Sequence, residues 1–225
     1  MPSWNVHTAH VERLLTREGA SALGVRDANA FLFGNLLPDL YVGYMVQPIT
    51  RKIPYAETHL TKAEFIPLPD HEAFWRRYVE RAASPDAPAA ELDLVLGAWC
   101  HLATDAVYNA HTRAFLAERA LKAGERIRIL KQGDFDVFGR TLDITSRLEA
   151  TDDLLAAAAA FPQYPVSAVD VRAAVRSLAR VVGENRERHV EGTPTYELLT
   201  PQFFSEASAE AHELLAARLR GHAGR

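Results

Sequence analysis

Residues 91–119 read ELDLVLGAWCHLATDAVYNAHTRAFLAER, a long helical stretch in a chain of 225 residues. Its apolar side chains recur at helical spacing but cover more than one face of a helix. A helix that is apolar nearly all round is buried nearly all round. We therefore predict a long central helix over residues 91–119, with the rest of the chain packed around it.

The sequence on both sides predicts further helices and no strands. A segment with four prolines and no clear helical period, residues 35–68, is expected to be irregular, and residues 84–88 are expected to form a turn. No stretch shows a persistent two-residue alternation of apolar and polar side chains. The fold class is therefore expected to be all-α, one multi-helix domain spanning residues 1–225. The expected helices cover residues 6–17, 27–33, 70–83, 134–149, 151–160, 165–189 and 201–220.

Composition limits the class of protein. Apolar residues make up 48% of the chain, enough for a real core, and the net charge of −4 gives no footprint for nucleic acid. No run of about 18 apolar residues exists that would form a transmembrane helix. The single cysteine, Cys100, excludes an internal disulfide, and the first residues do not resemble a secretory signal. We expect a cytoplasmic protein.

The strongest chemical signal is the pair His101 and Asp105 on the central helix. Residues four apart lie one turn above each other, so both side chains can reach one cation. An imidazole nitrogen with a carboxylate oxygen suits zinc, with iron and manganese as alternatives. An aspartate on an apolar helix is costly unless it is paired or metal-bound. A metal site is the favoured interpretation, and a buried His–Asp hydrogen bond is the other.

Asp39 follows a sharp turn, because Gly34 permits tight backbone geometry and Pro38 stiffens the approach. Two interpretations are open for Asp39: an acid presented from a rigid loop, or the cap of a following helix. His59 lies in the same proline-rich segment. A single histidine in a loop is weak evidence for a metal ligand, so His59 is a candidate only together with the other candidate ligands.

Four other residues are candidate ligands. His7 and His10 are three apart on the first helix, and His10 lies better on its apolar stripe with Leu14. His111 continues the series of the central helix. Asp134, in a glycine-containing segment expected to be a turn, offers one more carboxylate.

Taken together, these residues resemble the zinc-dependent phospholipase C family, whose fold is shared by the fungal single-strand nucleases and by the N-terminal domain of glycosylphosphatidylinositol phospholipase D. The resemblance spans roughly residues 4–140, in order along the chain. The residues that carry it are Trp4, the stretch from Thr8 to Glu12, the turn from Gly34 to Asp39, His59, His101, Asp105 and His111.

The resemblance implies a helical domain that holds up to three zinc ions. It implies that Asp39, His59, His101 and Asp105 hold one metal, and that Asp105 bridges to a second one, which His10 also binds. His111 would face a third metal, or Asn109 if the register differs.

Two departures from the family pattern reduce the expected number of metals to one or two. Secreted members use an N-terminal tryptophan whose amine binds zinc, whereas Trp4 is internal, so the second metal needs another ligand such as His7. The family's third site also needs a histidine after the position of His111, and none occurs over residues 112–188. Asp134 and Asp136 are the nearby substitutes.

The expected function is hydrolysis of a phosphoester by a metal-activated water, with Asp39 or Asp134 accepting a proton. The substrate is expected to be a small phosphoester, such as a nucleotide, or a lipid headgroup. Two alternatives stay open. One is a non-catalytic metal-binding domain that keeps the fold, and the other is a His–Asp type metallo-phosphohydrolase with a different helix order that acts on a soluble nucleotide.

Overall fold

A computed structural model describes residues 3–82 and 88–224 of the chain. Every regular element within these ranges is helical and none is a strand, so the all-α prediction is confirmed. The predicted turn at residues 84–88 lies almost wholly outside the described residues. The elements are α1 (Trp4–Glu18), η1 (Ser21–Leu23), α2 (Ala28–Gly34), α3 (Leu37–Leu40), α4 (Tyr55–Thr58), α5 (His71–Phe74), η2 (Trp75–Val79), α6 (Glu80–Ala82), α7 (Ala89–Glu118), α8 (Glu125–Arg140), α9 (Asp152–Ala159), α10 (Ala168–Glu187) and α11 (Pro201–Ala223).

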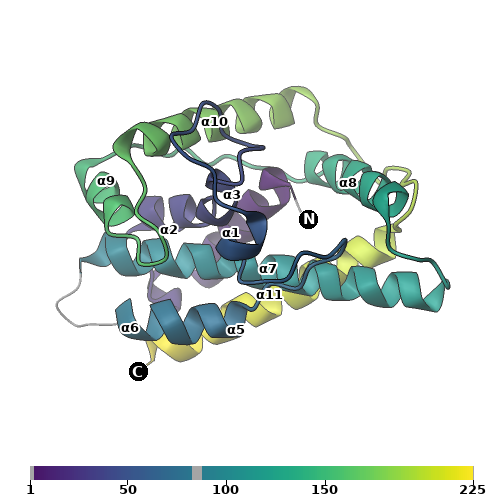
Figure 1. Cartoon of the computed structure of the whole chain (residues 1–225), viewed down its shortest axis with the longest axis horizontal. Helices are drawn as coiled ribbons and strands as arrows, with labels where there is room; N and C mark the ends of the chain where they lie inside the picture. Colours follow the sequence, from purple (N-terminus) through teal and green to yellow (C-terminus); the bar gives the residue numbers. More distant parts are fainter. Residues whose placement is uncertain (1–2, 83–87, 225) are drawn as a thin grey trace.

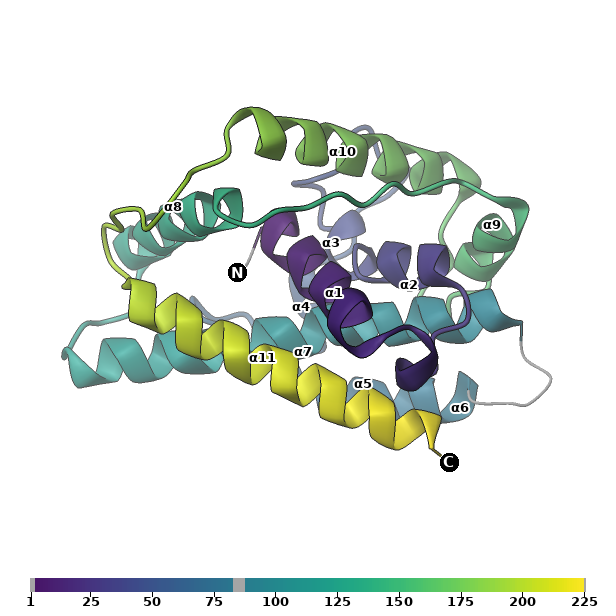
Figure 2. The ribbon, with the colours of Figure 1, turned by 180° about the vertical axis from the view of Figure 1, so that it is seen from behind.

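The predicted central helix is α7, which begins two residues earlier than expected and crosses the whole molecule (Figure 1). It contacts α2, α9 and α5, and α11 packs along it. Seen from behind, α1 lies between α11 and α10, with α8 at its N-terminal end (Figure 2). Twenty of the thirty residues of α7 are buried, which agrees with an apolar surface on more than one face.

The crossing of α2 and α7 depends on two glycines. A Cβ added to Gly97 would lie 2.0 Å from the Phe31 carbonyl oxygen, and one added to Gly34 would lie 2.1 Å from the Leu94 carbonyl oxygen. Such an overlap forces the backbones apart. Gly34 is the last residue of α2 rather than a break after Phe33, and its role is this close approach. The crossing brings the chain just after α2 against the middle of α7.

The structure corrects the predicted helix over residues 134–149. Helix α8 begins at Glu125 and ends at Arg140, so the expected turn around Asp134 is part of the helix. The following residues are extended, because the Glu12 carboxylate accepts hydrogen bonds from the backbone N–H groups of Thr145 and Ser146. A side chain distant in sequence thus competes with helix formation.

The segment 35–68 is largely irregular, as predicted, but it contains the single-turn helices α3 and α4. Asp39 lies in the first turn of α3, with Leu36 at the N-cap position, so Asp39 is neither on an open loop nor the cap of that helix. Asp27 and Asp70 cap α2 and α5 by accepting hydrogen bonds from backbone N–H groups. None of the described helices is long and apolar enough to cross a membrane.

Candidate metal centre

Five predicted ligands converge in the middle of the molecule from four separate elements. His7 comes from α1, Asp39 from α3, His59 from the residue that ends α4, and His101 and Asp105 from α7. All five are buried. They form two groups that share His101, and within each group one ligand atom per residue lies within 4.8 Å of the others. The fold therefore brings together side chains up to 98 positions apart, and both groups can hold a metal ion.

The orientation of His101 is set by the backbone of α2's C-terminal end. Its Nδ1 lies 2.8 Å from the carbonyl oxygen of Asn35. A carbonyl only accepts, so Nδ1 carries the proton and Nε2 carries a lone pair. This arrangement, a ring nitrogen bonded to a backbone carbonyl while the other nitrogen is free, is typical of metal-ligating histidines.

His59 is oriented in the same way by its neighbour Thr58. The Thr58 hydroxyl donates to the carbonyl oxygen of Tyr55 at 3.2 Å, and its oxygen lies 2.8 Å from Nδ1 of His59. Because a hydroxyl has one hydrogen, the oxygen of Thr58 accepts the proton of Nδ1. The Nε2 atom of His59 therefore also carries a lone pair.

These two lone pairs face each other. The Nε2 atoms of His59 and His101 are 3.3 Å apart. With both Nδ1 protons engaged elsewhere, two uncharged rings have no hydrogen to share between these atoms. Protonation of His59 is disfavoured, because burial, followed by the charge of His101, lowers its pKa well below the usual value. Two ligand atoms of a tetrahedral zinc ion lie about 3.4 Å apart for bonds of about 2.0–2.1 Å. The spacing is that of two nitrogens around one cation.

Two carboxylates complete the arrangement. The oxygens of Asp39 lie 3.7 Å from Nε2 of His59 and 3.8 Å from Nε2 of His101. Asp105 lies between the two groups, since its Oδ1 is 3.3 Å from Nε2 of His7 and its Oδ2 is 3.6 Å from Nε2 of His59. A carboxylate with one oxygen toward each group is suited to bridging two cations.

Several buried polar atoms at this centre lack a hydrogen-bond partner among the described residues. They are Nδ1 and Nε2 of His7 and Oδ1 of Asp105; the last two lie 3.3 Å apart but do not have hydrogen-bond geometry. The His7 ring is instead stacked on the His101 ring, with centroids 3.7 Å apart. Buried polar atoms are nearly always paired, and an ion is one of the recognised explanations when they are not. These atoms therefore fit a bound metal.

The electrostatics are those of a buried, mixed-charge cluster. Burial raises the pKa of Asp39 to about 6 and lowers the pKa of His7 to about 4. Burial also opposes ionisation of Asp105, but the neighbouring His7, His101 and His59 hold its pKa well below the usual range. His7 and His59 are thus neutral and Asp105 is ionised near neutral pH, which are the protonation states that metal binding requires of these ligands.

Tyr55, which the sequence did not single out, belongs to the same centre. Its hydroxyl donates to Oδ2 of Asp105 at 2.9 Å, and its ring stacks on that of His59 with centroids 3.6 Å apart. Burial, reinforced by the charges of Asp105 and Asp39, raises the pKa of Tyr55 well above 10, so the phenol stays protonated. The sequence signal that could have identified Tyr55 is its position one helical turn before His59.

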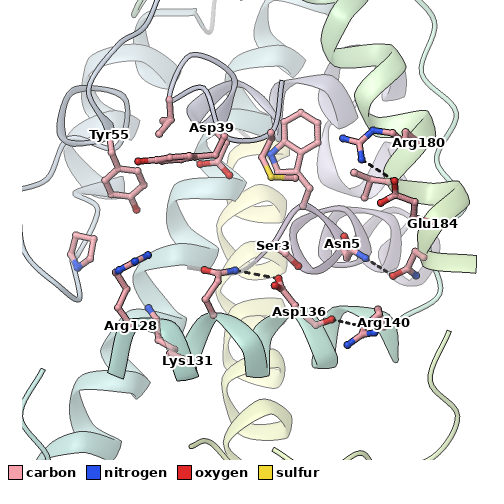
Figure 3. A pocket seen from close by; sticks show the side chains of 18 of the residues that line it. Ser3, Asn5, Asp39, Tyr55, Arg128, Lys131, Asp136, Arg140, Arg180 and Glu184 are labelled. Carbon is pink, nitrogen blue, oxygen red and sulfur yellow. Dashed lines mark hydrogen bonds and ion pairs between the residues drawn. The ribbon is translucent and has the colours of Figure 1, made fainter. Parts of the chain in front are cut away.

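A cavity of about 980 Å³ opens from this centre. Asp39 and Tyr55 line one side of it, while residues of α8, including Arg128 and Lys131, form the opposite wall (Figure 3). Trp4 at the start of α1 lines the same cavity and is fully buried. The metal centre is therefore buried but connected to a space large enough for a small molecule.

Three predicted ligands are not brought to the centre. Nε2 of His10 is hydrogen-bonded to the hydroxyl of Tyr108 at 3.0 Å, so on α1 it is His7, rather than the favoured His10, that joins the cluster. His111 lies 2.7 Å from a carboxylate oxygen of Glu210 on α11. The third, Asp134, is hydrogen-bonded to backbone groups that precede α11.

Asp134 acts as a structural cap. Its Oδ1 accepts a hydrogen bond from the backbone N–H of Glu197, and its Oδ2 accepts bonds from Leu198 and Leu199, at 2.7 to 2.8 Å. These bonds occupy both oxygens and fix the chain before α11. Asp134 is therefore engaged by the backbone, away from the five-residue cluster, and is not placed to act as a metal ligand or as a proton acceptor there. Asp136 is exposed on the same helix and accepts a hydrogen bond from Gln132.

Asn109, the alternative to His111, contacts Lys131 and the carbonyl of Pro67 rather than the five-residue centre. Thr58 and Asn35, which orient the ligand histidines, were not predicted from the sequence. A backbone carbonyl and a single hydroxyl have no sequence motif that would mark them.

Comparisons with protein-family models, with curated proteins and with solved structures find no match. The resemblance to the zinc-dependent phospholipase C family therefore remains an expectation from the sequence.

Proposed function

We propose that this chain is a metal-dependent hydrolase of phosphoesters that holds one or two divalent cations, most simply zinc. The observation that carries the metal is the pair of facing Nε2 atoms of His59 and His101, whose Nδ1 protons are both engaged elsewhere. Three imidazoles and two carboxylates are donors that suit zinc, and iron or manganese are the alternatives.

Divalent cations bound there would make water a better nucleophile and polarise a phosphoryl oxygen. The chain's own residues supply the rest. Asp39 lines the cavity and can accept a proton from an attacking water. Tyr55 holds Asp105 in place through its hydroxyl and forms part of the wall that faces the substrate.

The cavity favours an anionic substrate. Five cationic side chains line it beside four acidic ones, Asp39, Glu64, Asp136 and Glu184, so the lining carries a small excess of positive charge. Arg128 and Arg180 pair with Glu125 and Glu184, whereas Lys131 has no carboxylate partner among the described ion pairs. Small soluble phosphoesters and lipid headgroups both meet this requirement. Focusing of positive charge in a cleft raises the local concentration of an anionic substrate.

The test is hydrolysis of a chromogenic phosphodiester by zinc-loaded protein. Asp39→Asn is expected to lower kcat/KM at least 100-fold, whereas Asp136→Asn, which removes an acid from the same cavity outside the metal centre, is expected to leave it within about twofold. Zinc-loaded protein that turns over no faster than its Asp39→Asn variant would contradict hydrolysis. Such a result would leave a metal-binding domain without catalysis.

A further inference from the structure

Lys131 is a buried lysine in the wall of the cavity that faces the metal centre. It is 2% exposed, although it lines the cavity together with Arg128 from the previous turn of α8 (Figure 3). Lysine is among the residues least often buried, because its charge loses hydration. Its burial therefore needs an explanation.

The contacts that the structure gives the ammonium of Lys131 are with uncharged groups, the amide of Asn109 and the ring of Phe135, whose centroid is 5.8 Å from Nζ. Its Nζ lies 3.2 Å from Oδ1 of Asn109, whose own Nδ2 donates to the carbonyl of Pro67 at 2.8 Å. The second bond fixes which end of the amide faces the lysine. An ammonium has three donors, and one amide oxygen satisfies a single one of them. Lys131 makes no ion pair with a carboxylate among the described residues.

The neighbouring cations of the cavity are arranged differently. Arg128 makes two hydrogen bonds to the Glu125 carboxylate, and Arg180 pairs with Glu184. Burial lowers the pKa of Lys131, while the charge of Asp105 acts in the opposite direction. Lys131 thus lines the same cavity as Asp39 and Tyr55, and it lacks the carboxylate that its exposed neighbours have.

We propose that Lys131 is the anion-binding group of this cavity and that it holds an ionised phosphoryl oxygen of the substrate. The inference rests on the proposed function, and it names the residue that would bind the anionic oxygen of the phosphoester. Charge-assisted hydrogen bonds are about twice as strong as neutral ones, and a desolvated ammonium gains most from such a partner. Asn109 positions the ammonium.

The experiment measures binding of inorganic phosphate to zinc-loaded protein by calorimetry. Lys131→Met keeps the length and apolar stem of the side chain and removes the charge. Its matched control is Arg188→Gln, which removes one positive charge from an exposed side chain of the same cavity. We expect the phosphate Kd to rise at least tenfold in Lys131→Met and less than about threefold in Arg188→Gln, as for the loss of one charged hydrogen bond.

A second measurement on the wild-type chain does not depend on the folding of a variant. The chain has four lysines, Lys52, Lys62, Lys122 and Lys131, so their side-chain nitrogens can be followed by nuclear magnetic resonance. Addition of phosphate to the zinc-loaded protein is expected to shift the Lys131 resonance and leave the other three in place.

An unchanged phosphate Kd in a folded, zinc-loaded Lys131→Met variant would overturn the inference, as would a Lys131 resonance that phosphate does not move. Neither result bears on zinc content or on phosphodiester turnover, which test the proposed function. Conversely, phosphate binding through Lys131 in a protein without turnover would support the anion site and reject only the hydrolysis.

Discussion

The Nε2 atoms of His59 and His101 face each other across 3.3 Å at the centre of the fold, and each ring uses its Nδ1 proton in another hydrogen bond. One bond ends at the side chain of Thr58 and the other at the backbone of Asn35. Two acceptor atoms at this distance repel unless a positive charge lies between them.

Thr58→Val is expected to weaken zinc binding about tenfold to 100-fold, because the Nδ1 proton of His59 loses its acceptor and the ring loses its fixed tautomer. Competition with a chromophoric zinc chelator measures the affinity. Thr61→Val is the control, since its hydroxyl donates to the carbonyl of Leu68 and not to a ligand. Equal affinity in both variants would show that Thr58 does not orient His59.

Tyr55→Phe separates the two contacts of Tyr55. The ring that stacks on His59 remains, and only the hydroxyl that donates to Asp105 is lost. We expect about tenfold weaker zinc binding, because Asp105 is less firmly oriented. Tyr44→Phe, at an 84% exposed residue of the same cavity, should bind zinc like the wild type. A wild-type zinc affinity in Tyr55→Phe would show that the hydroxyl does not contribute to metal binding.

Asp134→Asn is expected to affect stability and not metal content. An amide can accept through one atom only, so at least one of the N–H groups of Glu197, Leu198 and Leu199 loses its partner. The cost is about 1–3 kcal/mol of unfolding free energy, measured by urea denaturation. Asp136→Asn on the same helix should change stability by less than about 0.5 kcal/mol. Loss of zinc in Asp134→Asn with unchanged stability would restore Asp134 as a ligand.

Asp93 gives a pH-dependent prediction. Burial raises its pKa to about 6, although its Oδ2 accepts hydrogen bonds from the backbone N–H groups of Arg26 and Asp27. The unfolded pKa is about 3.9, so the folded state binds the proton more tightly and this group stabilises the fold increasingly as the pH falls from about 7 toward 4.

Asp93→Asn removes this titration while its amide oxygen can still accept both bonds. The Tm of Asp93→Asn relative to that of the wild type is therefore expected to rise between pH 4.5 and pH 7.5. Measuring both proteins with a chelator present cancels the contribution of metal. A relative Tm that falls over this pH interval would contradict the stated pKa shift.

The sequence predicted most of the centre because helical spacing is local information. His101 and Asp105 lie one turn apart on a helix whose burial follows from its composition, and the structure places both in the cluster. His7 and His10 show the limit of this reasoning, since both lie on the inner side of α1 and the packing against Tyr108 decides between them.

What the sequence did not predict depends on contacts between distant segments. The extended path after α8 is set by Glu12, and Asp134 is occupied by backbone groups more than sixty residues away. Tyr55 and Lys131 become candidate functional residues only because they line the same cavity. None of these long-range relationships has a periodicity or spacing in the sequence that would predict it.

The central claim is tested most directly by the metal content of the purified protein. Elemental analysis after purification in the presence of zinc, followed by exhaustive dialysis, is expected to find one or two ions per wild-type chain and a loss of at least one of them in His101→Ala. The variant is also expected to unfold at a lower temperature, because ligands on the central helix couple binding to folding. Wild-type protein that is folded and carries well under one ion per chain would contradict the account.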